Sequence, residues 1–327
     1  MAGWDPVPWM VGGGAQHSPE VARMLAYVAF RGNEGVVGPG DLKVKALGVP
    51  GGSVTVDPGA CAILCRAAGQ LHQAYAGRVA TLDTVPISPT TASGGRSDLI
   101  IARVEDPWLA GEPWPDPADP TVGPYIRSVP IPGVPAGTTS LAQLGLGYSG
   151  IELARIDIPI STAAITQAMI VDLRKITNAR RERVVSTTNP GVQYNLTGTE
   201  YGTGQWTNAQ PQVWVPPWAV KAIVRTSIGG VAVTVGSAYG GLRTRIGSGG
   251  TVVTTQGTGF DETVPSGAVR DRKFWRDVDT VTVPAAMRGT YQTITLQAYK
   301  NSGSSASVYA DTSTSVEMDV EFLEAPA

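Results

Sequence analysis

Apolar and polar residues alternate with a period of two through much of residues 188–327, and this pattern constrains the fold more than any other feature. It is clearest in VEMDVEF at 316–322 and in TITLQAY at 293–299. Successive side chains of a strand point to opposite faces, so each run predicts a strand with one buried face. Gly229 and Gly230 are expected to form a turn before a similar run of valines. About eight to ten such strands without helical pattern predict a β-sandwich of the jelly-roll kind.

Residues 41–160 also show period-two runs, and a short helix precedes them. Turns rich in Gly and Pro separate runs at 42–47, 53–65, 73–82, 98–105, 125–131 and 152–158. Ser18-Pro19-Glu20 is typical of a helix start, and an apolar face follows at Val21, Met24, Leu25 and Val28. We therefore expect a mainly β chain, with an arm and short helix at 1–40 and a β-rich domain at 41–160.

Residues 161–187 are predicted to form a helical neck ahead of the sandwich at 188–327. After an N-cap at Ser161 or Thr162, apolar residues recur at spacings of three and four, at Ile165, Met169, Ile170, Leu173 and Ile176. A helix of about 15–20 residues is marginal alone in water, so this stripe needs another surface. Sister chains or the helix's own domain would supply it.

Basic residues gather toward the end of the predicted neck, at Arg174, Lys175, Arg180, Arg181 and Arg183. The C-terminal end of a helix favours cations, and a solvated helix end is the simpler interpretation. Nucleic-acid binding would need a wider basic surface. The formal net charge of -2 and the 16% of charged residues argue against it.

The sequence shows no sign of secretion, membrane insertion or metal binding. It lacks the basic and apolar regions of a signal peptide, and no apolar run approaches the ~18 residues of a membrane span, so a soluble product made in the cytoplasm is expected. Cys61 and Cys65 would lie about 13 Å apart on one face of a strand, too far for a disulfide, and are expected to be buried. His17 and His72 have no ligand spacing, so neither a metal nor a cofactor is predicted.

No catalytic residue is assigned. Residues 145–150 fit GxGxxG but precede a predicted strand instead of a helix, so phosphate binding is not expected. Acids occur at Asp261, Glu262, Asp271, Asp277 and Asp279. Their spacing along the chain does not fix the ~5 or ~6.5–9.5 Å carboxylate separation of a glycosidase. A glycan hydrolase therefore stays an alternative.

Aromatic residues in the C-terminal domain suggest carbohydrate contact. Aromatic faces bind the C–H surfaces of sugar rings while nearby polar groups orient them. The candidate ligand-binding residues are Trp206, Tyr201, Tyr239 and Trp275, with Trp206 expected to be exposed in the polar run YGTGQWTNAQ. Trp214 and Trp218 flank Val-Pro-Pro and are expected to pack as a corner of the sandwich.

Four other tryptophans are candidates for docking onto partner proteins. Trp4 and Trp9 lie on the N-terminal arm, ahead of three consecutive glycines. Trp108 and Trp114 lie in residues 107–124, whose six prolines predict an exposed polyproline-like loop. This loop either covers a sheet edge or contacts a partner through its tryptophans.

Three motifs in a fixed order resemble the N-terminal module of phage baseplate and tail-fibre proteins. The first is R-x-D-x-I-V-x-x-V, matched by Arg96, Asp98, Ile100, Ile101 and Val104. The second is L-A-x-I-x-V-P, matched by Leu153, Ala154, Ile156, Ile158 and Pro159. The third is I-T-x-x-M-I-x-D-L-R, matched by Ile165, Thr166, Met169, Ile170, Asp172, Leu173 and Arg174. The resemblance covers about residues 50–176, and the loop at 107–124 is longer than the family pattern.

The resemblance implies a virion protein of the phage tail tip, similar to minor tail proteins of actinobacteriophages. In that family the module attaches a homo-oligomer, commonly a trimer, to other tail and baseplate proteins, and the helix forms part of a neck. The C-terminal sandwich would then be displayed to a host cell-surface glycan or receptor. A tail-associated glycan hydrolase and a purely architectural baseplate protein are the alternatives.

Overall fold

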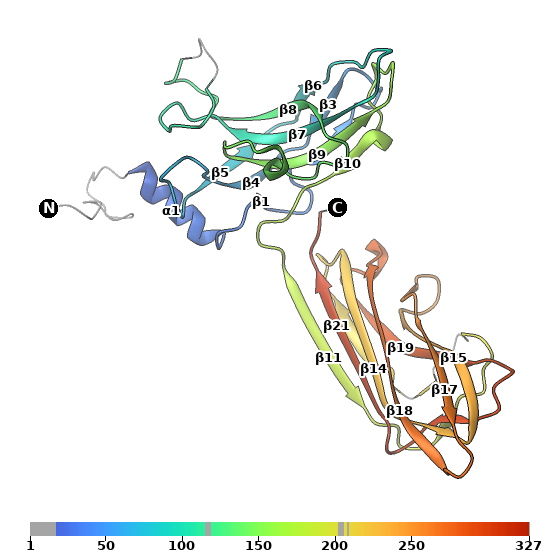
Figure 1. Cartoon of the computed structure of the whole chain (residues 1–327). Helices are drawn as coiled ribbons and strands as arrows, with labels where there is room; N and C mark the ends of the chain where they lie inside the picture. The colour runs from blue at the N-terminus through green and yellow to red at the C-terminus, as the bar shows by residue number, and fades with distance from the viewer. Residues whose placement is uncertain (1–17, 115–118, 202–205, 208, 327) are drawn as a thin grey trace. The chain divides into compact units, whose positions relative to one another are not determined.

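The chain forms two compact β-rich units, which divide between Asn178 and Ala179 (Figure 1). The computed structural model describes residues 18–326 except 115–118, 202–205 and 208. Unit 1 comprises the described residues 18–178 together with Pro326, and unit 2 comprises those of 179–325. Most regular structure in both units is strand, so the prediction of a mainly β protein is confirmed. No described helix is long and apolar enough to cross a membrane.

The N-terminal helix α1 (Pro19–Ala29) begins as the sequence predicts. Ser18 accepts a hydrogen bond from the backbone N–H of Val21 at 3.3 Å, and Pro19 occupies the first turn, where its missing N–H costs nothing. Only Val21 of the predicted apolar face is buried. Met24, Leu25 and Val28 are 46%, 39% and 66% exposed, so most of this face is open to solvent.

Unit 1 contains three antiparallel sheets. Two are small: β1 (Gly35–Val36), β4 (Gly59–Leu64) and β5 (Ala74–Val79) in one, and β2 (Val44–Ala46), β3 (Ser53–Val56) and β6 (Asp83–Pro86) in the other. The largest has the order β10-β9-β7-β8, formed by β7 (Arg96–Val104), β8 (Ile126–Val134), β9 (Gly150–Ile158) and β10 (Ile170–Asp172). These strands lie close to the runs predicted from the sequence.

Strand β7 separates two apolar layers. Ile100 faces the main core, whereas Leu99 and Ile101 pack on the other side with Leu141 of the 3-10 helix η1 (Leu141–Leu144). All three β7 residues have no exposed surface, because alternate side chains of the strand are covered from opposite sides. Cys61 lies in the main core and Cys65 is half-buried, and neither forms a disulfide. Burial raises the pKa of the Cys61 thiol to about 11.

The predicted neck helix is wrong. Residues 161–178 belong to unit 1, as extended pieces around a single turn of 3-10 helix, η2 (Gln167–Met169). Ile165 is buried and its N–H bonds to the carbonyl of Gly51 at 2.9 Å, Ile170 pairs with Ile156 in β9, and Ile176 bridges to Val36. The short turn between extended pieces produces the three- and four-residue spacing that suggested a helix.

The apolar stripe of this segment packs on its own unit. Ile165, Met169 and Ile176 contact the main core of unit 1, and Leu173 packs against the smaller one. The expected N-caps, Ser161 and Thr162, lie in the loop before these pieces. The sequence analysis left two possible surfaces for this stripe, sister chains or the chain's own domain. In the structure the stripe packs on its own domain.

Arg174 is buried, not part of a solvated helix end. Its guanidinium forms a two-point ion pair with Asp172, with nitrogen–oxygen distances of 2.9 and 2.7 Å. It also donates to the carbonyls of Asp41 at 2.6 Å and Pro39 at 3.1 Å. Five donors arranged in one plane allow a single arginine to satisfy all these acceptors. Arg174 therefore ties β10 to the loop before β2.

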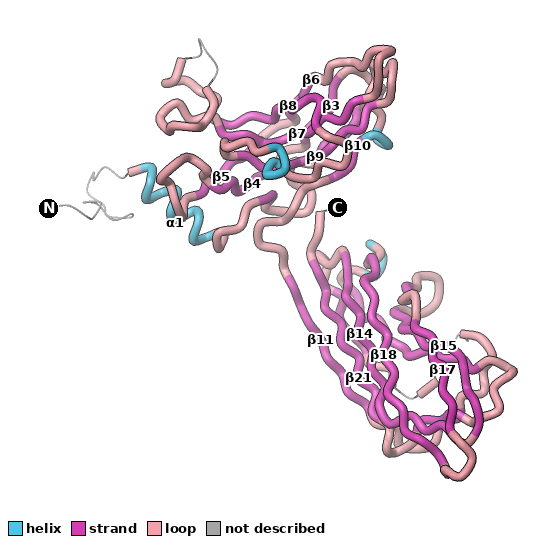
Figure 2. The backbone as a smooth tube through the Cα atoms, in the orientation of Figure 1, coloured by secondary structure: helices cyan, strands magenta, loops and turns pink. Residues whose placement is uncertain are grey.

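Unit 2 is an antiparallel sandwich, which confirms the predicted fold class (Figure 2). One sheet has the order β11-β21-β14-β20-β12, with β18 on the other side of β14; its strands are β11 (Arg181–Thr188), β12 (Tyr194–Asn195), β14 (Lys221–Thr234), β18 (Arg270–Thr282), β20 (Val308–Ala310) and β21 (Ser315–Leu323). The second has the order β13-β19-β15-β16, with β17 beside β15; its strands are β13 (Gln212–Val215), β15 (Gly236–Ile246), β16 (Val253–Thr254), β17 (Thr258–Val264) and β19 (Thr290–Lys300). A 3-10 turn, η3 (Ala285–Met287), precedes β19. One continuous core lies between the sheets.

The remaining arginines of the basic run pair with acids near the C-terminus. In β11, Arg183 contacts both carboxylate oxygens of Asp319 in β21, at 2.8 and 2.9 Å. Arg180 pairs with Glu324 at 2.5 Å. Hydrogen bonds from these guanidiniums lower the pKa values of Asp319 and Glu324 below their usual range. The run thus joins the first strand of unit 2 to its last.

The expected turn at Gly229 and Gly230 is instead a bulge within the single long strand β14. Gly230 has a φ of 75°, and a Cβ there would lie 2.3 Å from the carbonyl oxygen of Ser313. Only glycine fits this backbone and this contact. The valines that follow therefore continue β14 and do not begin a new strand.

Candidate functional site

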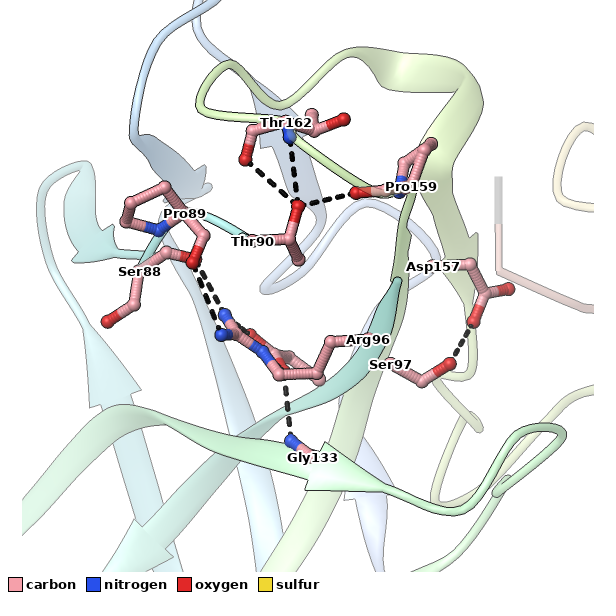
Figure 3. Close-up of polar contacts among 10 residues, drawn as sticks. Ser88, Pro89, Thr90, Arg96, Ser97, Gly133, Asp157, Pro159 and Thr162 are labelled. Atoms are coloured by element: carbon pink, nitrogen blue, oxygen red, sulfur yellow. Dashed lines mark hydrogen bonds and ion pairs between the residues drawn. The ribbon is translucent and has the colours of Figure 1, made fainter. Parts of the chain in front are cut away.

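An open depression of about 610 Å³ lies at one end of the largest sheet of unit 1, where β7 begins and β8 and β9 end. Its central charge, Arg96, points to the loop before β7 (Figure 3). The guanidinium contacts the two carboxylate oxygens of Asp98 at 2.7 and 2.8 Å and donates to the carbonyl of Ser88 at 2.6 Å. Asp98 is 1% exposed and also accepts the N–H of Gly133 at 3.0 Å. This pair therefore holds β7, β8 and the preceding loop together.

The carboxylate that lines the depression, Asp157, is also bound by neighbouring side chains. Ser97 donates its hydroxyl to Asp157 at 2.8 Å, and Arg155 contacts both carboxylate oxygens at 2.8 and 2.9 Å. The hydrogen bonds from Arg155 hold the pKa of Asp157 below its usual range. Nearby, Thr90 accepts the N–H of Thr162 at 2.9 Å and donates to the carbonyl of Pro159 at 2.5 Å. The polar groups of this depression thus fix loops to the sheet.

A groove of about 410 Å³ lies between α1, β5 and the loop rich in Pro and Trp. Its aromatic wall consists of Tyr75, Trp108 and Tyr125, and its polar wall of Glu20, Arg23 and Asp106. Trp108 is 71% exposed and Tyr125 is 44% exposed. The guanidinium of Arg23 lies over the Tyr75 ring, 5.5 Å from its centroid. Aromatic rings beside carboxylates are suited to bind apolar rings that carry polar groups.

The described part of the loop at 107–124 is attached to unit 1 at several points. Asp106 accepts the N–H of Trp108 at 2.9 Å and the hydroxyl of Tyr75 at 3.1 Å. Glu112 accepts the backbone N–H of Ser149 at 2.9 Å. The Trp114 ring stacks on Tyr125, with centroids 5.7 Å apart. Trp114 therefore packs on its own unit, while Trp108 remains open to solvent.

The Tyr75 hydroxyl stays protonated at the base of this groove. Burial raises its pKa above the usual tyrosine range, and the neighbouring Cys65 and Asp106 raise it further. A neutral hydroxyl that donates to Asp106 fixes the carboxylate on which the Trp108 loop depends. The groove is thus built from side chains that hold one another in place.

Two of the four predicted glycan-binding residues lie in the core of unit 2. Trp206 is 7% and Trp275 is 6% exposed, and their rings stack with centroids 6.0 Å apart. Phe260 also stacks on Trp275, with ring centroids 4.0 Å apart. The indole N–H of Trp275 donates to Glu262 at 2.9 Å. The expectation that Trp206 is exposed is wrong. Its neighbours in the sequence are polar, but its own ring packs in the core of unit 2.

The other two predicted residues lie at the surface of unit 2 in different settings. Tyr201 is half-buried, meets Tyr299 edge to face at 4.7 Å and lies under Arg243, whose guanidinium is 4.2 Å from the ring centroid. Burial raises the pKa of the Tyr201 hydroxyl. Tyr239, on β15, is 39% exposed. The four residues therefore do not form one exposed aromatic face.

An exposed aromatic pair that the sequence analysis did not assign as a site lies on the second sheet. Trp214 in β13 and Tyr291 in β19 are direct partners in the strand register, with ring centroids 5.2 Å apart. They are 40% and 67% exposed. Trp214 and Trp218 were both expected to pack as a corner of the sandwich. Only Trp218 packs against the core. The alternation along β19 could have identified Tyr291. Residues two apart in a strand lie on the same face, and Tyr291 is two residues before Thr293, which was predicted to face outward.

Four of the five candidate catalytic acids of unit 2 contact neighbouring groups, and the fifth, Asp261, is exposed. Asp277 is 1% exposed and accepts the hydroxyls of Thr244 at 3.1 Å and Thr255 at 2.5 Å. Lys273 pairs with Glu262 at 3.1 Å and with Asp271 at 2.8 Å. Asp279 accepts the N–H of Gln256 at 2.8 Å. Among the described residues, no three His, Cys, Asp or Glu side chains come together as a metal site would require.

Comparisons with known proteins give only remote likenesses. No protein-family model matches the chain, and no curated protein matches its sequence. The VP2 subviral particle of infectious bursal disease virus is 14% identical, with a TM-score of 0.27, over 90% of this chain and 74% of that one. An isomalto-dextranase of Arthrobacter globiformis T6 is 10% identical, with a TM-score of 0.19, over 84% of this chain and 36% of that one. Such low scores do not establish a shared fold, so these likenesses carry no argument about function.

Trp4 and Trp9, the other predicted docking residues, lie outside the described residues. Of the two candidates for docking that the structure describes, Trp108 and Trp114, Trp108 is the one whose exposed ring borders this groove. The sequence analysis missed the rest of that groove, because Glu20, Tyr75, Asp106 and Tyr125 come from segments far apart in the chain. Proximity created by folding leaves no local sequence signal.

Replacing Trp275 tests whether the aromatic stack is structural. Trp275→Ala is expected to lower the free energy of unfolding by about 3–5 kcal/mol, because it opens a cavity beside Phe260 and Trp206. The matched control, Trp214→Ala, removes an exposed ring and is expected to cost less than about 1.5 kcal/mol. Urea unfolding followed by circular dichroism measures both. Equal losses would contradict the assignment of Trp275 to the core and Trp214 to the surface.

Proposed function

We propose that this protein is a structural component of a phage tail tip or baseplate, located in the virion, with unit 1 attaching to the tail and unit 2 displayed. One observation carries the proposal. The motif residues of the tail-module resemblance, Arg96 with Asp98 and Asp172 with Arg174, form ion pairs within the largest sheet of unit 1 and to its loops. The third motif also ends close to the boundary of unit 1. The resemblance therefore corresponds to one folded unit.

Attachment is assigned to surfaces of unit 1 that leave apolar residues in contact with solvent. Met24, Leu25 and Val28 form an open apolar face on α1. Exposed apolar surface of this kind commonly marks contact with another protein. The partners are other tail or baseplate proteins and sister copies of this chain, in a homotrimer.

Light scattering on the purified full chain tests the homotrimer. The expected mass is three times 34.0 kDa. In the proposed assembly the α1 face lies between copies, so Leu25→Glu, which buries a charge there, is expected to shift the mass toward the monomer. Leu71→Glu, at an 81% exposed position, is the matched control and is expected to leave the trimer intact. A monomer for the unaltered chain at every concentration would contradict the proposal.

Display is assigned to unit 2, and its exposed aromatics support host-surface glycan recognition. Trp214 and Tyr291 replace the buried Trp206 and Trp275 as the residues that would contact sugar rings. We assign no enzymatic activity to the protein. The structural contacts of Asp277, Glu262 and Asp271 support a binding protein over a glycan hydrolase. A purely architectural baseplate protein remains the second alternative.

Sedimentation of the full chain with purified actinobacterial cell walls tests display. Binding is expected, and the double variant Trp214→Ala/Tyr291→Ala is expected to weaken it at least about tenfold, the equivalent of 1.4 kcal/mol. Trp108→Ala, in unit 1, is the matched control and should bind as before. Release of reducing ends from the walls would instead favour the hydrolase. Absence of binding to every wall in a broad panel would favour the architectural alternative.

A further inference from the structure

The groove between α1 and the Trp108 loop is aromatic, open and held in shape, and among the described residues nothing fills it. Trp108 stays 71% exposed although its backbone N–H is bound to Asp106, so its exposure is a property of an anchored loop. Tyr125, at 44% exposed, continues the apolar wall. Large exposed rings are costly in water, and a groove that presents two of them is suited to an apolar occupant.

The start of α1 forms part of the wall of this groove. Pro19 and Glu20, at the start of α1, line it. Residues 1–17 directly precede them and lie outside the described residues. Their sequence includes Trp4-Asp-Pro-Val-Pro-Trp9. Alternating prolines favour an extended polyproline-like conformation, and aromatic-lined grooves are a recurrent binding surface for such segments.

We propose that the groove binds residues 4–9 of the same chain. Their prolines and tryptophans would cover the rings of Trp108 and Tyr125, and the carboxylates of Glu20 and Asp106 offer acceptors for an indole N–H. The nine residue-to-residue steps from Trp9 to Ser18 span up to about 30 Å when extended, and Gly12, Gly13 and Gly14 let the chain reverse. This short tether keeps the segment at an effective concentration in the millimolar range.

Fluorine NMR of the full chain labelled with 5-fluorotryptophan tests the proposal. The chain has eight tryptophans, and Trp108→Phe identifies the Trp108 resonance. The double variant Trp4→Ala/Trp9→Ala is expected to shift that resonance and to increase its sensitivity to a soluble paramagnetic quencher. The Trp214 resonance, from unit 2, is the internal reference and should not move. Gln16→Ala, outside residues 4–9, is the matched control and should leave the Trp108 resonance unchanged.

An unchanged Trp108 resonance in the double variant would overturn the proposal, and unchanged circular dichroism confirms that the comparison is between folded proteins. Dilution distinguishes the chain's own segment from that of a second copy. Binding within one chain predicts a Trp108 resonance that is independent of concentration over a hundredfold range. A shift toward the double-variant position on dilution would overturn binding by the same chain. Neither outcome depends on cell-wall binding, so this test and that of the proposed function can fail separately.

Discussion

Burial of β7 on both faces is the constraint on which the rest of unit 1 depends. The strand supplies Leu99 and Ile101 to one apolar layer and Ile100 to the other, so charges near its ends must be neutralised where they meet the core. Asp98 near its start pairs with Arg96, and Glu105 just after its end, with no exposed side-chain surface, pairs with Arg103 and Arg127. Removing one partner of such a pair leaves a buried charge, which is strongly destabilising.

In unit 2 an aromatic stack and an ion-pair network lie on opposite faces of one sheet. The inner face carries the Trp275 stack, which fills the space between the sheets. The outer face carries an ion-pair network in which Asp319 contacts both Arg183 and Arg225. Because Arg183 lies in the first strand of the unit and Asp319 in the last, the network joins the two ends of the domain's sequence. Unit 2 thus has its own core and its own ion pairs between its first and last strands.

The alternation of apolar and polar residues predicted the strands well. Successive side chains of a strand point to opposite faces of the sheet, so the sequence itself records which of them face the core. Tertiary contacts decided the features that were missed. Ile165 and Ile176 suggested a helix, yet each forms an isolated β-bridge to a residue far away in the sequence, Gly51 and Val36 respectively. The polar surroundings of Trp206 suggested exposure, yet its ring enters the core of unit 2. The groove at Trp108 required segments that only the fold brings together, so no sequence pattern could predict it.

Each unit is held by its own core and its own ion pairs, and Arg96 and Asp98 close unit 1. Hydrogen exchange of the full chain carrying Asp98→Ala, compared with the unaltered chain, tests this claim most directly. Exchange is expected to be faster in peptides from β7, β8 and β9 and unchanged in peptides from 179–325. Asp157→Ala, which removes a 45% exposed side chain, is the matched control and should have a small effect. Unchanged exchange in unit 1, or equal loss of protection in both units, would contradict the account.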